Sequence, residues 1–283
     1  MGEFLSDLES QAFLQYALLT GLLASIACGM IGSYVVTRRI TYIAGAIAHS
    51  VLGGMGAARY FETVCGWQWL NPIHGAVGAA LLSAVIIGMV SLNARQREDT
   101  VIGAVWAIGM AVGVLFIFKT PGYNEDLMSY LFGNILMVSV DDLWLIAGLD
   151  VFILLVGILF YNPLLAVCFD EEFARIRGIR VEFYYILLLC MTALTVVLLV
   201  TVVGIVMVIA LLTLPAAIAG HFSKRLWQMM VLSIFFSASF TTLGIMVSYG
   251  PDLPSGATII ALAGAVYLAV AVGDRVIHRW RRS

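Results

Sequence analysis

Long apolar segments with almost no charge follow one another along most of the chain. A helix needs about 20 residues to cross about 30 Å of hydrocarbon, and charge-poor segments of that length recur between residues 11 and 273. We expect nine membrane-spanning helices, at 12–36, 40–60, 72–92, 101–118, 142–165, 183–202, 204–222, 227–248 and 256–273. The pattern therefore predicts an all-α integral membrane protein in which residues 1–283 form a single transmembrane domain.

The composition agrees with a membrane protein. Hydrophobic residues make up 62% of the chain and charged residues 11%, whereas a soluble domain carries about 25% charged residues. The N-terminus, MGEFLSDLES, is acidic and lacks the basic start of a signal peptide. The 4 cysteines form no CxxC pair, so they indicate neither a disulfide framework nor a thiolate zinc site. No basic stripe with interleaved aromatics is present, and we expect no nucleic acid partner.

The basic residues set the predicted orientation, because cytoplasmic segments of membrane proteins are enriched in Lys and Arg. With nine spans and the N-terminus outside, 13 of the 15 basic residues are cytoplasmic, and only Arg59 and Lys119 lie outside. The 13 are Arg38, Arg39, Arg95, Arg97, Arg175, Arg177, Arg180, Lys224, Arg225, Arg275, Arg279, Arg281 and Arg282. If 183–223 were one span, 7 basic residues would lie inside and 8 outside. We therefore predict two spans there and a cytoplasmic C-terminus.

Two local features of these spans follow from the backbone. Bare irregular backbone is not tolerated in lipid, so the turn near Gly204 must be tight or covered by protein. Pro215 lacks an N–H group and should interrupt the hydrogen-bond ladder of the seventh span. In the first span, small residues recur every four positions, at Gly21, Ser25, Gly29 and Ser33. Such a stripe predicts close approach of another helix.

The longest predicted cytoplasmic segment between spans is FDEEFARIRGIRVE, residues 169–182. Phe169, Phe173 and Ile176 are spaced to share one helical face, and Gly178 suits the end of a helix. We predict a short surface helix at about 169–180. The residues alone leave two interpretations open, a solvated interfacial helix and a docking helix for a cytoplasmic partner.

Motifs that would mark an enzyme are missing from the sequence. A phosphate-binding loop requires GxxxxGK followed by Ser or Thr, and no such run occurs. HExxH and GxSxG, which mark zinc proteases and serine hydrolases, are absent as well. We therefore predict that the chain is not an enzyme and that a separate subunit would hydrolyse ATP if transport is ATP-driven.

Six sequence runs, in order along the chain, resemble the permease subunits of metal-cation ABC importers, which take up zinc, manganese or iron. They are RRITYIAGAIAHSVLGG (38–54), REDTVIGAVWA (97–107), LMSYLFGNIL (127–136), EEFARIRGI (171–179), LLTLPAAIA (211–219) and DLPSGATII (252–260). The resemblance implies a permease of the bacterial inner membrane that binds no cofactor and carries a divalent metal as cargo. It also implies a second permease copy in a homodimer, cytoplasmic ATP-binding subunits and an extracytoplasmic metal-binding protein.

The run EEFARIRGI lies where this family has its coupling helix, so the resemblance favours the docking interpretation. Glu172, Ala174 and Gly178 occupy matching positions, and Arg175 and Arg177 complete the set of candidate coupling residues. Two of the other runs allow structural interpretations. Asp99 or Thr100 could cap the fourth span, and the segment with Asn134 is too short to span and could dip into the membrane.

His49 is the unusual residue of the second span. It lies about ten residues into the helix, or about 15 Å deep, and ionisable groups near mid-bilayer usually face a bundle interior or water. Its column on the helix is Gly45, His49, Gly53 and Ala57, which suits either close helix packing or a narrow pathway. We predict a role for His49 in the metal pathway, because a neutral imidazole suits zinc, manganese or iron.

The partners of His49 are less evident. Many members of the family carry an Asp one turn earlier, where this chain has Gly45. Asp150 lies at a similar predicted depth and could replace that acid, or it could pair with a neighbouring hydroxyl or amide. His74, at the outer end of the third span, is a weaker candidate for an entry site, and His221 and His278 are expected near the cytoplasmic face.

Zinc or manganese is the expected cargo, with iron next, and the site should be incomplete because cargo must leave. Three alternatives remain. The cargo could be a metal chelate or vitamin, which would fit the missing acid at Gly45. The chain could be an ion-coupled secondary transporter that uses His49 and Asp150 as a proton relay. It could also be a membrane scaffold without transport activity.

Overall fold

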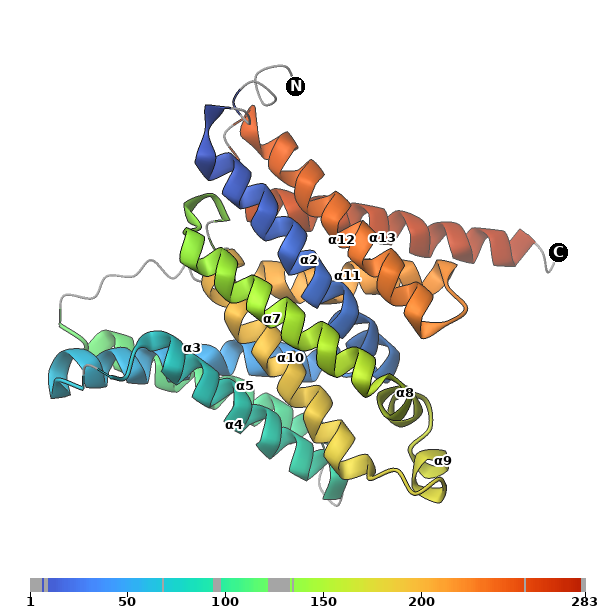
Figure 1. Cartoon of the computed structure of the whole chain (residues 1–283), viewed down its shortest axis with the longest axis horizontal. Helices are drawn as coiled ribbons and strands as arrows, with labels where there is room; N and C mark the ends of the chain where they lie inside the picture. The colour runs from blue at the N-terminus through green and yellow to red at the C-terminus, as the bar shows by residue number, and fades with distance from the viewer. Residues whose placement is uncertain are drawn as a thin grey trace.

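The computed structural model describes residues 7, 10–67, 69–93, 98–121, 133, 135–251 and 253–280 (Figure 1). These residues are helical apart from short connections, and no strand occurs among them. The helices are α2 (Ala12–Arg38), α3 (Thr41–Cys65), α4 (Pro72–Asn93), α5 (Glu98–Lys119), the 3₁₀ turn η1 (Ile135–Met137), α7 (Val140–Leu159), α8 (Tyr161–Phe169), α9 (Glu171–Ile176), α10 (Val181–Val203), α11 (Ile205–Phe222), α12 (Leu226–Tyr249) and α13 (Ser255–Trp280).

A helix lies at each of the nine segments that the hydrophobic pattern picks out. Eight of these helices are long and apolar enough to cross a membrane. The ninth, α3, has 25 residues, but His49, Ser50 and its glycines lower its mean hydropathy. The all-helical membrane fold is thus confirmed, whereas the count of nine spans and the orientation stay predictions.

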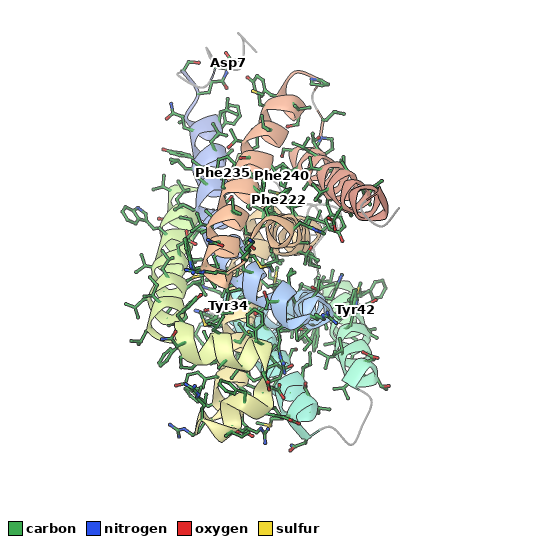
Figure 2. The ribbon with its side chains drawn as sticks, turned by 90° about the vertical axis from the view of Figure 1, so that its right-hand side faces the viewer. Asp7, Tyr34, Tyr42, Phe222, Phe235 and Phe240 are labelled. Atoms are coloured by element: carbon green, nitrogen blue, oxygen red, sulfur yellow. The ribbon has the colours of Figure 1, made fainter. Side chains whose placement is uncertain are left out.

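The helices form two groups joined by two central helices (Figure 1). One group contains α3, α4 and α5, and the other contains α11, α12 and α13. α2 packs on α7, α11 and α12, while α10 packs on α3, α4 and α7. Before α2, Asp7 accepts a hydrogen bond from the Tyr249 hydroxyl at 2.7 Å, which fastens this segment to the end of α12 (Figure 2).

The helix predicted at 142–165 is not continuous to its end, because it breaks at Phe160. Pro163 explains the break. It cannot donate a hydrogen bond to the carbonyl of Leu159, four residues earlier, and its ring crowds that carbonyl. α7 therefore ends at Leu159, and α8 continues in a new direction to Phe169.

The segment 183–222 divides at Gly204, as predicted. α10 ends at Val203 and α11 begins at Ile205, with Gly204 at φ +83° and ψ 158°. A Cβ added to Gly133 would overlap the backbone of Val203, so the chain at Gly133 lies directly on this turn and covers it. The neighbouring Asn134 lies outside the described residues.

Pro215 does not end α11, which runs unbroken through it. Its missing N–H leaves one carbonyl without its usual helical donor. Just before it, the Thr213 hydroxyl donates to the carbonyl of Ile209 at 2.8 Å. A Cβ added to Gly32 of α2 would overlap the carbonyl of Leu212, so α2 crosses α11 in backbone contact beside the proline.

The small-residue stripe of α2 packs closely on α12, which confirms its predicted use. A Cβ on Gly29 would lie 2.5 Å from the Ile234 side chain, and one on Gly21 would lie 3.1 Å from Thr241. Ser25 and Ser33 turn inward and donate to the carbonyls of Gly21 and Gly29 at 2.6 and 2.7 Å. Their hydroxyls are thereby satisfied within α2, so the face stays smooth and needs no partner from α12.

The smooth face of α3 is also a packing face. A Cβ on Gly53 would lie 2.8 Å from the carbonyl of Gly109, and one on Gly56 would lie 2.8 Å from that of Gly113, both in α5. On the α4 side, a Cβ on Gly54 would overlap the carbonyl of Gly75. The sequence allowed either close helix packing or a narrow pathway along this face. The glycines support close packing, so His49 is the residue of this face that still indicates a pathway.

Two glycines of α4 allow a matched test of this packing. In Gly75→Ala the new methyl group overlaps the Gly54 backbone, and we expect a loss of about 1–3 kcal/mol of stability. In Gly78→Ala the methyl group meets open space, so the change should be neutral or stabilise by up to about 1 kcal/mol. Thermal unfolding of the purified variants in detergent measures both, and equal midpoints would contradict the packing account.

Candidate functional site

His49 lies half-buried on α3 with its ring against α5. The imidazole stacks on the indole of Trp106, with ring centroids 4.4 Å apart and planes 15° from parallel. Stacking of this kind holds the plane of the imidazole, while the lone pair of the unprotonated nitrogen lies in that plane and points past the indole. The edge of the ring therefore stays available to a ligand.

Trp106 also covers Gly45, one turn before His49. A Cβ built on Gly45 would lie 3.4 Å from Cζ3 of the indole, which is ordinary van der Waals contact. Alanine would fit there, but a longer side chain would have to share its space with the indole. The space beside Gly45, where the family resemblance implies an acid, is thus occupied by a tryptophan from another helix.

A hollow of about 340 Å³ opens beside Trp106 between the starts of α3 and α5. Tyr42, Asp99, Ile102, Gly103 and Trp106 line it, and Tyr42 is 76% exposed (Figure 2). α5 begins at Glu98, so Asp99 and Thr100 lie inside its first turn. The prediction that one of them caps the helix is therefore wrong. The Asp99 carboxylate instead stands at the edge of the hollow.

Sequence reasoning missed Trp106 and Tyr42 as parts of this site. A tryptophan on an apolar helix is expected in a core or against lipid, so the residue type alone gives no signal. The spacing of Asp99, Ile102, Gly103 and Trp106 does place them on one helical face. That signal could have been read, but nothing in the sequence says that this face meets His49.

Asp150 lies elsewhere, on the face of α7 that packs against α2. It is 3% exposed, and its carboxylate lies beside Ala27 and Cys28 of α2. No side-chain donor in the described part of the chain reaches its oxygens, so the predicted hydroxyl or amide partner is not found there. α7 packs on α2, α8 and α10, and α3 is not among its main neighbours. The structure therefore does not bring Asp150 together with His49.

The other histidines are also separate from His49. His74 lies exposed in the first turn of α4, with Nδ1 3.2 Å from the carbonyl of Trp69. His221, at the end of α11, has Nδ1 3.7 Å from a carboxylate oxygen of Asp274 on α13. The side chain of His278 lies outside the described residues. Among the described residues no three His, Cys, Asp or Glu side chains converge as a metal site.

The predicted surface helix is present as α9, but it is shorter than 169–180. Asp170 is extended and accepts a hydrogen bond from the Phe173 N–H at 3.0 Å, so it caps α9 and separates it from Phe169. At the other end Gly178 has φ +76°. Its N–H donates to Arg175, and the N–H of Ile179 donates to Ala174, both at 3.0 Å. This is the glycine-ended helix terminus that the sequence predicts.

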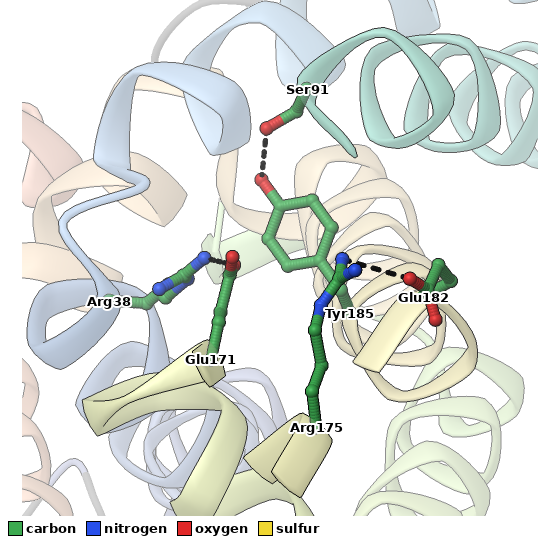
Figure 3. Close-up of polar contacts among 6 residues, drawn as sticks. All are labelled: Arg38, Ser91, Glu171, Arg175, Glu182 and Tyr185. Atoms are coloured by element: carbon green, nitrogen blue, oxygen red, sulfur yellow. Dashed lines mark hydrogen bonds and ion pairs between the residues drawn. The ribbon is translucent and has the colours of Figure 1, made fainter. Parts of the chain in front are cut away.

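Two ion pairs attach α9 to the long helices (Figure 3). Glu171 pairs with Arg38 at the end of α2, and Arg175 pairs with Glu182 of α10 at 2.8 Å. Close to both, Tyr185 of α10 and Ser91 of α4 form a hydrogen bond of 3.1 Å. α9 is therefore linked by charge to α2 and α10, the two central helices.

Of the other side chains in and next to α9, one is buried against the bundle and the rest are exposed. Ala174 is fully buried, and its small side chain lets α9 lie close to its neighbours. Glu172 is exposed and forms no ion pair within the described residues. Arg177 lies over the Phe173 ring at 4.9 Å. Phe173 and Ile176 are 48% and 86% exposed, so α9 presents an apolar surface outward.

Comparisons with known proteins agree with this architecture. The model of the ABC 3 transport family matches residues 10–273. A probable metal transport system membrane protein of Chlamydia trachomatis is 40% identical, over 89% of this chain and 85% of its own length. A manganese transport system membrane protein of Halalkalibacterium halodurans is 36% identical, over 93% of this chain and 88% of its own.

A solved structure gives the same result in three dimensions. One chain of PsaBC from Streptococcus pneumoniae, solved in complex with a Fab, is 32% identical and superposes with a TM-score of 0.82, covering 95% of this chain and 94% of that one. The relatives are transport permeases, which confirms that this chain is a transport subunit and not an enzyme. The chain is a member of the ABC 3 transport family, a multi-pass permease of the bacterial inner membrane.

Proposed function

We propose that the chain is the permease of an ATP-driven importer whose cargo is a divalent transition metal, manganese first, then zinc, then iron. The observation that carries the proposal is the half-buried imidazole of His49, stacked face to face on Trp106 within a run of mostly small and apolar residues. The names of the relatives from Chlamydia trachomatis and Halalkalibacterium halodurans, which refer to metal and manganese transport, support the choice of cargo.

In this proposal the metal meets few ligands from one chain. His49 offers one nitrogen, and the carboxylate of Asp99 stands at the edge of the adjoining hollow, where a hard cation leaving the imidazole would be attracted. A site with so few protein ligands holds its cargo weakly, as release requires. The other ligands would come from water or from the second permease copy.

Asp150 and His74 enter the proposal at separate positions. His74 would meet cargo at the predicted outer end of α4, where its ring is already tethered to Trp69. Asp150 is a buried acid that no side-chain donor among the described residues reaches, a costly arrangement that is usually retained for a function. It would act at the α2–α7 contact and not as a second ligand beside His49.

The proposed coupling uses α9. Cytoplasmic ATP-binding subunits would press on its exposed surface, formed by Glu172, Phe173, Ile176 and Arg177. The ion pairs of Glu171 and Arg175 would pass that movement to α2 and α10. Because these two helices join the two groups of the bundle, a shift of α9 could change the spacing between the groups.

The alternatives have less support. A proton relay between His49 and Asp150 would need the two residues near each other, and they lie against different helices. A metal chelate or vitamin would suit the absence of an acid at Gly45, but the names of the relatives refer to metal and manganese transport.

The first test replaces the imidazole. We expect His49→Ala to reduce uptake of radiolabelled manganese and zinc by about tenfold or more, because a ligand should matter at least as much as the residues that support ligands. The matched control is His221→Ala, which removes a histidine at the end of α11 away from the site. Uptake at the parental rate in His49→Ala would make this histidine a packing residue.

The second test concerns Trp106. An aromatic pair contributes about 0.5–1.5 kcal/mol, so Trp106→Ala should expose the imidazole and raise the rate of His49 modification by diethylpyrocarbonate roughly two- to tenfold. Trp106→Phe keeps a ring and should stay near the parental rate. Peptide mass spectrometry measures the modification without any transport, and no difference between the two variants would contradict the positioning role.

The third test addresses coupling. Gly178→Val should abolish uptake, since a β-branched residue at φ +76° distorts the end of α9. Gly178→Asn should retain most activity, because Asn tolerates this backbone region. Glu172→Lys, which reverses an exposed charge, should lower uptake while the permease stays folded in the membrane. Uptake unchanged in Gly178→Val and Glu172→Lys would show that α9 is not the docking helix.

A further inference from the structure

A groove of about 930 Å³ lies between α8, α9 and the junction of α11 with α12. It is separate from the hollow at His49. Its walls combine exposed aromatic and aliphatic side chains with cations, and the residues that matter below are Leu165, Phe169, Arg177, Lys224, Arg225 and Trp227. Phe173 and Arg177 of the proposed docking surface also line the groove, but that surface does not account for Lys224, Arg225 and Trp227 on the opposite wall.

The cations come from two segments far apart in the sequence. Arg177 follows α9, whereas Lys224 and Arg225 form the junction before α12. None of the three forms an ion pair with a carboxylate in the described part of the chain. The acid that lines the groove, Asp170, already accepts the Phe173 N–H as the cap of α9. The groove therefore carries net positive charge that the described chain does not neutralise.

The apolar part of the groove lies next to a membrane span. Trp227 is the second residue of α12, which is a candidate span, and it is 50% exposed. Tryptophan is enriched where a span meets the membrane surface. Phe169 at the end of α8 is 67% exposed, and Leu165 lies one turn before it. These side chains would face the boundary between acyl chains and headgroups.

We propose that this groove binds an anionic phospholipid, with the phosphate between Lys224, Arg225 and Arg177 and the acyl chains along Leu165, Phe169 and Trp227. Basic pockets at the cytoplasmic ends of spans suit such headgroups, and Arg pairs well with phosphate oxygens. A lipid supplies negative charge and apolar surface in one molecule. A soluble ATP-binding subunit can neutralise the cations, but it cannot cover side chains at the level of the membrane.

The position of the groove gives the lipid a consequence for transport. Its walls include α9 on one side and the start of α12 on the other. A bound phosphate that pairs with Arg177 and with Lys224 would hold these two elements together across the groove. Anionic lipid would then set how firmly the proposed coupling helix is seated, so transport activity should depend on membrane composition.

The test uses the permease purified with its ATP-binding subunits and returned to nanodiscs of phosphatidylglycerol or phosphatidylcholine, without metal. Each basic residue near an anionic surface contributes about a factor of five, so Lys224→Gln with Arg225→Gln should weaken phosphatidylglycerol retention roughly thirtyfold. Native mass spectrometry reports retained lipid. Lys119→Gln, at the far end of α5, is the matched control and should retain lipid as the parent does.

A second measurement needs no charge variant. Brominated phosphatidylglycerol should quench the fluorescence of Trp227, obtained as the difference between the parent and Trp227→Phe, more strongly than brominated phosphatidylcholine does. Equal quenching by the two lipids would overturn the proposal. Displacement of the lipid by millimolar inorganic phosphate would also overturn it, since the site would then bind free phosphate. A third result would overturn it as well: the Lys224→Gln, Arg225→Gln double variant loses its ATP-binding subunits but retains as much lipid as the parent.

Discussion

The fold depends on helices that approach one another until their backbones touch. In lipid there is no hydrophobic gain from pairing two apolar helices, so van der Waals contact between small residues has to hold them. Gly54 with Gly75, Gly53 with Gly109 and Gly32 with Leu212 are such contacts, and each joins a different pair of helices. A methyl group on Gly32, Gly53, Gly54 or Gly75 would overlap or crowd a carbonyl of the neighbouring helix, and one on Gly109 would crowd the backbone of Ser50.

The same contacts explain how α3 can carry a histidine. α3 is the one helix among the nine predicted spans that falls short of the apolar character of a membrane span, yet α4 and α5 enclose it through glycine contacts on two sides. Two of its polar residues find partners on these neighbours. Ser50 bonds to the carbonyl of Ile47 and accepts from Ser83 of α4, and His49 rests on Trp106 of α5. Contacts with α4 and α5 thus accommodate the polar residues that lower the hydropathy of this helix.

The end of the bundle that holds α8 and α9 follows a different rule, because there charge and capping take over from glycine packing. Pro163 breaks the helix after α7, Asp170 starts α9 and Gly178 ends it, so each boundary has a local chemical cause. Ion pairs then fix α9 to α2 and α10. α9 is thus held to the two central helices by ion pairs whose side chains stay partly exposed to solvent.

By itself the sequence determined the all-helical membrane class, the helical segments, the break at Gly204 and the glycine end of α9, because hydropathy and turn chemistry act over a few residues. It also singled out His49 and the family through short runs of residues. It did not reveal that Trp106 covers Gly45, that Asp150 lies away from His49, or that Arg177 lines one groove with Lys224 and Arg225. Only the tertiary structure decided these, since each depends on which helices pack together, and the contacts responsible join residues dozens of positions apart.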